Sequence, residues 1–239
     1  MNENMFQFEK GLEILHITLT EIQKDQFVKF YERLVEKNKV MNLTAITEWE
    51  DVVQKHFLDS LSLVRVLDLN QIETLIDVGT GAGFPGIPLK IAFPHIKITL
   101  MDSLNKRIRF LEEVIQVCGL EEIEAIHSRA EDLARNQKYR ENYDLCVSRA
   151  VANLSALSEY CLPFVKVGGQ FISYKSAAAA EETVQAQRAI EILGGKKRMI
   201  DQFQLPDSDI SRALVVVDKV KNCSKKYPRK AGMVTSQPL

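Results

Sequence analysis

The chain has 239 residues, of which 46% are apolar and 26% charged, and its formal net charge is −1. These values predict one large globular domain, or one domain with a helical extension, and exclude a disordered, collagen-like or fibrous protein. No run approaches the ~18 apolar residues of a membrane span and the first residues do not resemble a signal peptide, so we expect a cytoplasmic protein without a membrane partner.

Residues 1–65 have the apolar spacing of helices and are expected to form a cap on the rest of the chain. Thr20 and Gln23 fit a capping box that opens an amphipathic helix. A second box at residues 47–50 is expected to open another helix, and residues 42–44 form the connecting loop. The apolar stripes that predict the two helices are Phe27, Phe30, Tyr31, Leu34 and Val35, and then Val52, Val53, Phe57, Leu61 and Val64.

From residue 74 onward, short apolar strands alternate with helices, which predicts a parallel sheet covered by helices on both faces. The expected strands are residues 74–78, 97–101, 123–127, 143–148 and 170–174, and the expected helices include 104–118 and 177–193. Two further strands, 196–205 and 213–220, are too close in the chain for a parallel crossover and are expected to form an antiparallel hairpin. We therefore expect an α/β core of seven strands over residues 66–220.

Residues 221–239 are expected to form a basic tail. Six basic residues and no acidic ones follow from Lys219 onward, so the 218 residues before it carry a net charge of −7. A basic tail on an acidic body indicates contact with a polyanion, and the candidate phosphate ligands are Lys225, Lys226, Arg229 and Lys230. The alternative is a solvated extension.

A glycine-rich loop follows the first predicted strand, which ends in Asp77 and Val78. Glycines in such a loop permit positive φ angles and close approach of a ligand. Gly81, Gly83 and Gly86 fit the G-x-G-x-x-G pattern of dinucleotide-binding proteins, with Asp102 as the ribose ligand. Gly79, Gly81 and Gly83 also fit G-x-G-x-G, which resembles motif I of S-adenosylmethionine-dependent methyltransferases.

Three observations favour the methyltransferase. Asp77 would repel a pyrophosphate but attract a methionine ammonium. Pro85 and Pro88 remove backbone donors that a pyrophosphate would need. The closing hairpin is the topology of class I (Rossmann-like) methyltransferases. Asp102 can accept both hydroxyls of a ribose, or cap the next helix instead, and residues 128–132 are expected beside the adenine.

Further motifs make the resemblance narrower. They are Asn42-Leu43-Thr44, His56-Phe57-Leu58-Asp59-Ser60-Leu61, Gly81-Ala82-Gly83-Phe84-Pro85-Gly86 and Ser148-Arg149-Ala150. Together they resemble the ribosomal RNA small subunit methyltransferase G family, also called glucose-inhibited division protein B, over nearly the whole chain. The resemblance implies methylation of N7 of a guanine in 16S ribosomal RNA near the decoding site, on free RNA or within the small subunit. It also implies cofactor contacts at Gly79, Phe84, Ala130, Glu131 and Arg149.

Methylation of N7 needs no general base, because this nitrogen has a lone pair and no proton. Arg149 is the best candidate for positioning a ligand, or else it forms an ion pair with Asp77 or Glu131. His56 either covers the target base as an RNA ligand or locks the helices onto the core.

The remaining predictions concern a cysteine, a basic helix face, metal binding, the oligomeric state and alternative functions. Cys146 is expected in the core rather than as a nucleophile. Lys106, Arg107 and Arg109 are expected on a solvated helix face, no metal site is predicted, and a monomer is expected. The alternatives are an NAD(P)-dependent oxidoreductase and a methyltransferase acting on a protein or a small molecule.

Overall fold

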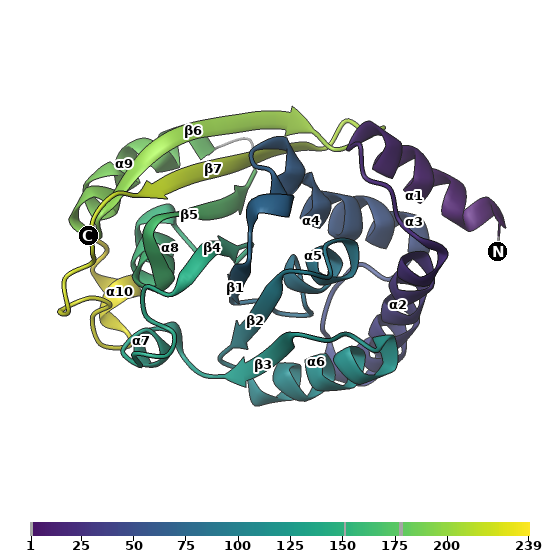
Figure 1. The fold of residues 1–239 in the computed structure, drawn as a ribbon, viewed down its shortest axis with the longest axis horizontal. Helices are drawn as coiled ribbons and strands as arrows, with labels where there is room; N and C mark the ends of the chain where they lie inside the picture. The colour runs from purple at the N-terminus through teal and green to yellow at the C-terminus, as the bar shows by residue number, and fades with distance from the viewer. Residues whose placement is uncertain (1, 151, 177–178) are drawn as a thin grey trace.

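A seven-stranded sheet in the order β3-β2-β1-β4-β5-β7-β6 runs through the molecule (Figure 1). The computed structural model describes residues 2–150, 152–176 and 179–239. The strands are β1 (Thr74–Val78), β2 (Lys97–Asp102), β3 (Ile123–His127), β4 (Tyr143–Ser148), β5 (Val165–Lys175), β6 (Gly195–Gln204) and β7 (Ser211–Lys219). The predicted strands are confirmed, although β5 begins five residues before the expected start at Gln170.

Strand direction follows the lengths of the connections. Neighbouring strands from β3 to β5 are parallel, because helices or long crossovers join them, whereas β7 is antiparallel to both β5 and β6. Only residues 205–210 separate β6 from β7, which is enough for a hairpin but not for a crossover. The predicted closing hairpin is therefore confirmed, and with it the class I methyltransferase topology.

Helices cover both faces of the sheet and leave two hydrophobic cores between the layers. Strand residues alternate between them: Leu75 belongs to one core and Ile76 to the other, and both are fully buried. The first core lies under α1 (Asn2–Ile14), α2 (Glu21–Met41), α5 (Gly86–Ala92) and α6 (Asn105–Cys118). The second lies under α7 (Ala130–Leu133), α8 (Leu154–Cys161) and α9 (Ala179–Ile192). Figure 1 shows the two groups of helices on opposite sides of the sheet. The expected start of α9 at Ala177 lies outside the described residues.

The N-terminal helices share the first core with the sheet. Helix α2 begins with the predicted capping box, in which the Gln23 amide nitrogen donates to Thr20 Oγ1 (3.3 Å) and the Thr20 amide nitrogen to Gln23 Oε1 (2.8 Å). Phe27 from α2 packs edge-to-face on Phe57, with ring centroids 4.9 Å apart. Because these rings are fully buried, α2 is anchored by packing as well as by its cap.

The second predicted capping box, at residues 47–50, is wrong. Helix α3 (Trp49–Val52) begins after Glu48, which makes no side-chain cap hydrogen bond. The helical segment that follows is irregular: a π-helical turn, η1 (Val53–Leu58), leads into α4 (Asp59–Leu61) and the 3-10 turn η2 (Ser62–Arg65). Apolar spacing alone does not distinguish these helix types, so the π turn was not predictable from the stripe.

The remaining short elements are the 3-10 turns η3 (Leu69–Gln71) and η4 (Leu162–Phe164) and the C-terminal helix α10 (Met233–Ser236). None of the helices in the described ranges is long and apolar enough to cross a membrane.

Candidate functional site

A cavity of about 700 Å³ lies where β1, β2, β3 and β4 reach their carboxyl ends. This is the edge of an open α/β sheet at which ligands bind, and the volume is in the range of small-molecule sites. Seven predicted cofactor residues line it: Gly79, Gly81, Phe84, Asp102, Ala130, Glu131 and Arg149. His56, from the N-terminal segment, also lines the cavity. Asp77 and Gly83, which were predicted with them, do not.

The glycines of the loop after β1 serve different purposes. Gly81 has φ +63°, and a Cβ there would have no atom within 4 Å, so this backbone faces open space in the cavity. At Gly83, with φ +95°, a Cβ would lie 2.6 Å from Ile87 Cγ1 and 3.0 Å from Leu111 Cδ2. Gly83 is therefore required by packing beneath the loop and does not line the cavity.

Asp77 braces the glycine loop from below. Its Oδ2 accepts hydrogen bonds from Thr80 Oγ1 (2.7 Å) and the Gly86 amide (2.8 Å), whereas Oδ1 has no hydrogen-bond partner among the described residues. Complete burial raises the pKa of Asp77 to about 7, although both hydrogen bonds act in the opposite direction. Asp77 thus supports the loop through Thr80 and Gly86, and its predicted contact with a ligand ammonium stays a prediction.

Asp102 joins the ends of β1 and β2 at the cavity. Its Oδ2 accepts from the Gly81 amide (3.0 Å) and from Arg107 Nη1 (3.1 Å), and its Oδ1 accepts from the Leu104 amide (2.9 Å). The alternative role of Asp102 as the cap of the next helix is not seen, because the N-cap residue of α6 is Leu104. Arg107 also lines the cavity, so the expectation that its helix face is merely solvated is wrong for this residue.

Arg149, at the end of β4, crosses to the π turn of the N-terminal segment. Its Nη1 donates to Asp59 Oδ2 (2.7 Å) and to the Lys55 carbonyl (3.0 Å), and its Nη2 lies 2.8 Å from His56 Nδ1. The guanidinium carbon lies 5.3 Å from the centroid of the Phe84 ring. Arg149 therefore forms an ion pair as one alternative expected, but its partner is Asp59 rather than Asp77 or Glu131.

His56 is held neutral in this cluster. Burial, followed by the charge of Arg149, lowers the pKa of His56 to about 3. Because Arg149 can only donate, His56 Nδ1 is the acceptor, and Nε2 carries the proton toward Thr44 Oγ1 at 3.0 Å. The ring stacks on Phe84, with centroids 4.4 Å apart and an interplanar angle of 18°. The imidazole thus locks the helical segment to the loop, with no free lone pair for proton abstraction.

Other lining residues carried weaker signals in the sequence. Thr44 lies in the Asn-Leu-Thr motif, but its role depends on a partner twelve residues further along the chain. Tyr160, from α8, has no motif that marks it. Cys146 is fully buried in β4, which confirms its predicted place in the core.

The C-terminal tail is docked on the second core rather than extended. Tyr227 and Val234 are buried, and Arg229 forms two hydrogen bonds from Nε and one from Nη2 to the buried carboxylate of Glu159, at 2.6–3.0 Å. Arg229 is therefore occupied by a structural ion pair, unlike the exposed Lys225 and Lys226.

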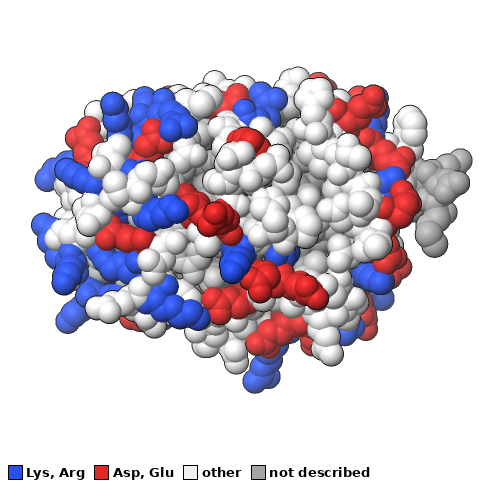
Figure 2. All heavy atoms as spheres, viewed as in Figure 1, with Lys and Arg blue, Asp and Glu red and all other residues white. Residues whose placement is uncertain are grey.

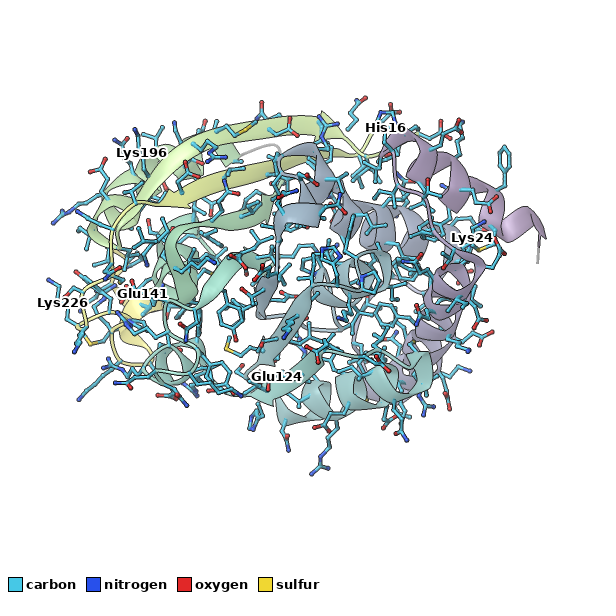
Figure 3. The ribbon with its side chains drawn as sticks, viewed as in Figure 1. His16, Lys24, Glu124, Glu141, Lys196 and Lys226 are labelled. Atoms are coloured by element: carbon cyan, nitrogen blue, oxygen red, sulfur yellow. The ribbon has the colours of Figure 1, made fainter. Side chains whose placement is uncertain are left out.

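Charge is unevenly distributed over the visible surface. Lys and Arg gather at the end of the molecule near α9, α10 and β6, whereas Asp and Glu are prominent at the opposite end near α1 (Figure 2). Lys226 and Lys196 both lie at the basic end, whereas Lys24 lies at the other (Figure 3).

The chain is similar to proteins of known family. A family model described as rRNA small subunit methyltransferase G matches residues 23–211. The protein named Ribosomal RNA small subunit methyltransferase G from Lachnoclostridium phytofermentans is 53% identical over 97% of this chain and 96% of its own length. The protein of the same name from Exiguobacterium sp. is 48% identical over 100% of both chains.

Among solved structures, the ribosomal protein L11 methylase from Lactobacillus delbrueckii subsp. bulgaricus has a TM-score of 0.50 and 16% identity. The match covers 69% of this chain and 78% of the other. At this identity the likeness concerns the fold alone.

Proposed function

This chain belongs to the rRNA small subunit methyltransferase G family, as its motifs predict, and from this premise we propose a function. The protein transfers a methyl group from S-adenosylmethionine to N7 of a guanine in 16S ribosomal RNA, near the decoding site. The observation that carries this proposal is the cavity at the ends of β1 to β4, which joins the glycine loop, Asp102 and the Arg149 cluster.

The residues of the cavity fit S-adenosylmethionine. Gly81 leaves open space where any side chain would project, and Asp102 presents a carboxylate beside it. We propose that Asp102 accepts the ribose hydroxyls, that Ala130 and Glu131 contact the adenine, and that Gly79 and Gly81 allow close approach of the methionine portion. When bound, the cofactor would supply a methyl group on a positively charged sulfur for direct transfer to N7.

No proton needs to move in this transfer, so the chain's own residues have to align the reactants and exclude water. His56 suits such a site, because its pKa of about 3 leaves it neutral and Arg149 occupies its Nδ1 lone pair. The π faces of Phe84 and His56 and the guanidinium of Arg149 form one continuous wall of the cavity.

We further propose that residues 1–65 act as the cap, residues 66–220 as the catalytic core and residues 221–239 as the basic tail of a monomeric cytoplasmic enzyme. Lys225, Lys226 and Lys230 are exposed and are proposed to contact RNA phosphates.

Cofactor binding separates this function from the oxidoreductase alternative. Calorimetric titration should give saturable binding of S-adenosylhomocysteine and no binding of NADH; the reverse result would replace the methyltransferase. Mass spectrometry of nucleosides from 16S ribosomal RNA should then show that 7-methylguanosine is lost on deletion of the gene and restored by the wild-type chain. Retention of the modified nucleoside in the deletion strain would contradict the assignment to N7.

The contribution of the C-terminal tail to RNA binding can be measured from the salt dependence of that binding. The logarithm of the RNA-binding constant falls linearly with the logarithm of the salt concentration, and Lys225→Ala/Lys226→Ala should reduce the size of this slope by about 0.7–0.9 per lost phosphate contact. Lys10→Ala/Lys29→Ala, which removes two exposed lysines from α1 and α2, serves as the matched control and should leave the slope unchanged. Equal slopes for the two double variants would remove the tail from the RNA-binding surface.

A further inference from the structure

A second cavity of about 580 Å³ adjoins the first. His56, Arg149, Ala150 and Ala152 line both, so the two spaces meet at the end of β4. The other walls of the second cavity come from the π turn and α4, the end of β5 and the start of β7. It therefore lies beside the cofactor cavity, where a methyl acceptor has to enter.

Most polar side chains of the second cavity are committed to other parts of the protein. Lys175 Nζ donates to the Ala152 carbonyl (2.6 Å) and to Glu182 Oε1 (2.8 Å), and the Tyr174 hydroxyl donates to the Ser60 carbonyl (2.7 Å). These groups fix the shape of the cavity but have little capacity left to recognise a ligand.

Asp59 is different. It is only 3% exposed, and its Oδ2 accepts from Arg149, but its Oδ1 accepts no hydrogen bond from any described residue. Arg212 Nε lies 3.3 Å from Oδ1 as an ion-pair partner without hydrogen-bond geometry. A buried carboxylate oxygen that lacks a donor is costly. Because Asp59 lines the second cavity, a ligand bound there is in position to bring the missing donor to this carboxylate.

Arg149 provides free hydrogen-bond donors at the junction of the two cavities. Its guanidinium has five N–H groups, and three are used toward Lys55, Asp59 and His56. Two N–H groups therefore remain. From the first cavity toward the second, the wall presents hydrogen-bond donors on Arg149 and then an acceptor on Asp59, which lines only the second cavity.

We propose that the second cavity binds the target guanine, flipped out of the RNA, and that Asp59 reads its Watson–Crick edge; this inference rests on the proposed function. Along one side of guanine the order is N7, O6, N1–H and N2–H₂. N1–H and N2–H₂ donate to Asp59 Oδ1, O6 accepts from Arg149, and N7 then lies toward the cofactor cavity. A base bound in this way has to leave its stack and its pairing, as in other enzymes that modify bases.

This arrangement discriminates between purines. Adenine has a lone pair at N1 where guanine has a proton, so it would face Asp59 with an acceptor against an acceptor. Inosine keeps N7, O6 and N1–H and lacks only the N2 amino group. The inosine comparison therefore isolates one hydrogen bond to Asp59 without removing the methyl acceptor.

The test uses the full chain and two synthetic RNAs that differ only in guanosine or inosine at the target position. For the wild type, kcat/KM and the RNA affinity of the S-adenosylhomocysteine complex should both fall about 10–100-fold with inosine, the loss expected for a charge-assisted hydrogen bond. For Asp59→Asn, the preference for guanosine should disappear, because the carboxamide oxygen has to face the Arg149 donor and its NH₂ group then faces the guanine amino group, donor against donor. Asp51→Asn, an exposed carboxylate of the same helical segment, should keep the wild-type ratio.

Each outcome distinguishes this inference from the proposed function. If the wild type methylates both RNAs equally, or if Asp59→Asn keeps the full preference, Asp59 does not read the base. If the wild type methylates neither RNA, the proposed function itself is wrong, and the inference about Asp59 falls with it. Should Asp59→Asn fail to fold, Asp59→Glu retains the charge that Arg149 requires and displaces the oxygens; an undiminished preference in that variant would likewise overturn the inference.

Discussion

The two walls of the cofactor cavity are built on different principles. One wall is the glycine loop after β1, where backbone amides of Gly81 and Gly86 are fixed by the carboxylates of Asp102 and Asp77. The other is formed by His56 and Arg149, which contact each other, and Arg149 is also paired with Asp59 outside this cavity, so that side chains from two distant parts of the chain form one cluster. The loop wall depends on residues without side chains, whereas the cluster wall depends on buried charge.

This difference decides what each wall tolerates. A change in the loop wall that keeps its backbone conformation should affect the ligand and spare the fold. A change in the cluster wall should affect the fold first, because removing one partner leaves a buried charge unpaired. The following predictions test that contrast.

The largest effect is expected in the cluster wall. Asp59→Ala leaves the Arg149 guanidinium without its carboxylate and should lower the free energy of unfolding by about 3–5 kcal/mol in urea denaturation. Asp51→Ala breaks the exposed pair with Lys55 and should cost about 0–1 kcal/mol. Equal losses for the two variants would show that the cluster is no more than a surface contact.

The loop wall should lose the ligand instead. Gly81→Asn places a side chain in the cavity with the non-glycine residue that best tolerates a left-handed backbone, and should weaken S-adenosylhomocysteine binding at least ~30-fold, or about 2 kcal/mol. Gly119→Asn is the matched control, because Gly119 has φ +60° and open space around it but lies at the end of α6, away from the cavity. Unchanged affinity in calorimetric titration of Gly81→Asn would remove the ligand from this loop.

The two walls should respond to pH in opposite directions. The pKa of Asp77 is raised from 3.8 to about 7, so its contribution to stability is full below pH 3.8 and is lost as the pH rises to 7. The pKa of His56 is lowered from 6.5 to about 3, so its contribution is full above pH 6.5 and is lost as the pH falls. Between pH 3.8 and 6.5 the two slopes oppose each other.

Single variants expose each slope. In Asp77→Asn, stability should rise with pH between 4 and 6.5, by up to about 1.4 kcal/mol per pH unit relative to the wild type. In His56→Gln, which keeps one acceptor and one donor, stability should fall over the same range. Urea unfolding across this range measures both, and parallel curves for the three proteins would contradict the opposed titrations.

The smallest effect is expected on the chemistry itself. Because N7 carries no proton and His56 stays neutral, single-turnover methylation should be nearly flat from about pH 6 to pH 9 in the wild type and in His56→Gln. The measurement is a quench-flow profile with enzyme in excess over RNA. A steep rise in the wild type that His56→Gln abolishes would show general-base catalysis from the cluster wall, and the assignment to N7 would have to be abandoned.

The loop wall was largely predictable from the sequence because its signals are local. Gly79 and Gly81 follow an apolar strand directly, and Asp102 ends the next strand, so topology alone brings them together. The sequence did not indicate that the Asp77 carboxylate bonds to the loop and that Gly83 packs beneath it, so that neither residue lines the cavity. Spacing along the chain does not say which side of a loop a group faces.

The cluster wall and the tail show the opposite case. The pairing of Arg149 with Asp59 joins residues 90 positions apart, and that of Arg229 with Glu159 joins residues 70 apart. Several acidic residues were possible partners for each arginine. The pairing was decided by the π turn and by the docking of the tail on α8, neither of which has a sequence signature.

The sequence by itself determined the order and type of the strands, the closing hairpin, the glycine loop and the family, because apolar period, turn residues and short motifs act over a few neighbouring residues. The tertiary structure alone decided the neutral state of His56, the occupied guanidinium of Arg149 and the unmatched oxygen of Asp59. These properties arise from desolvation and from charges brought close in space. Both depend on how distant segments pack, and no local pattern of residues specifies that packing.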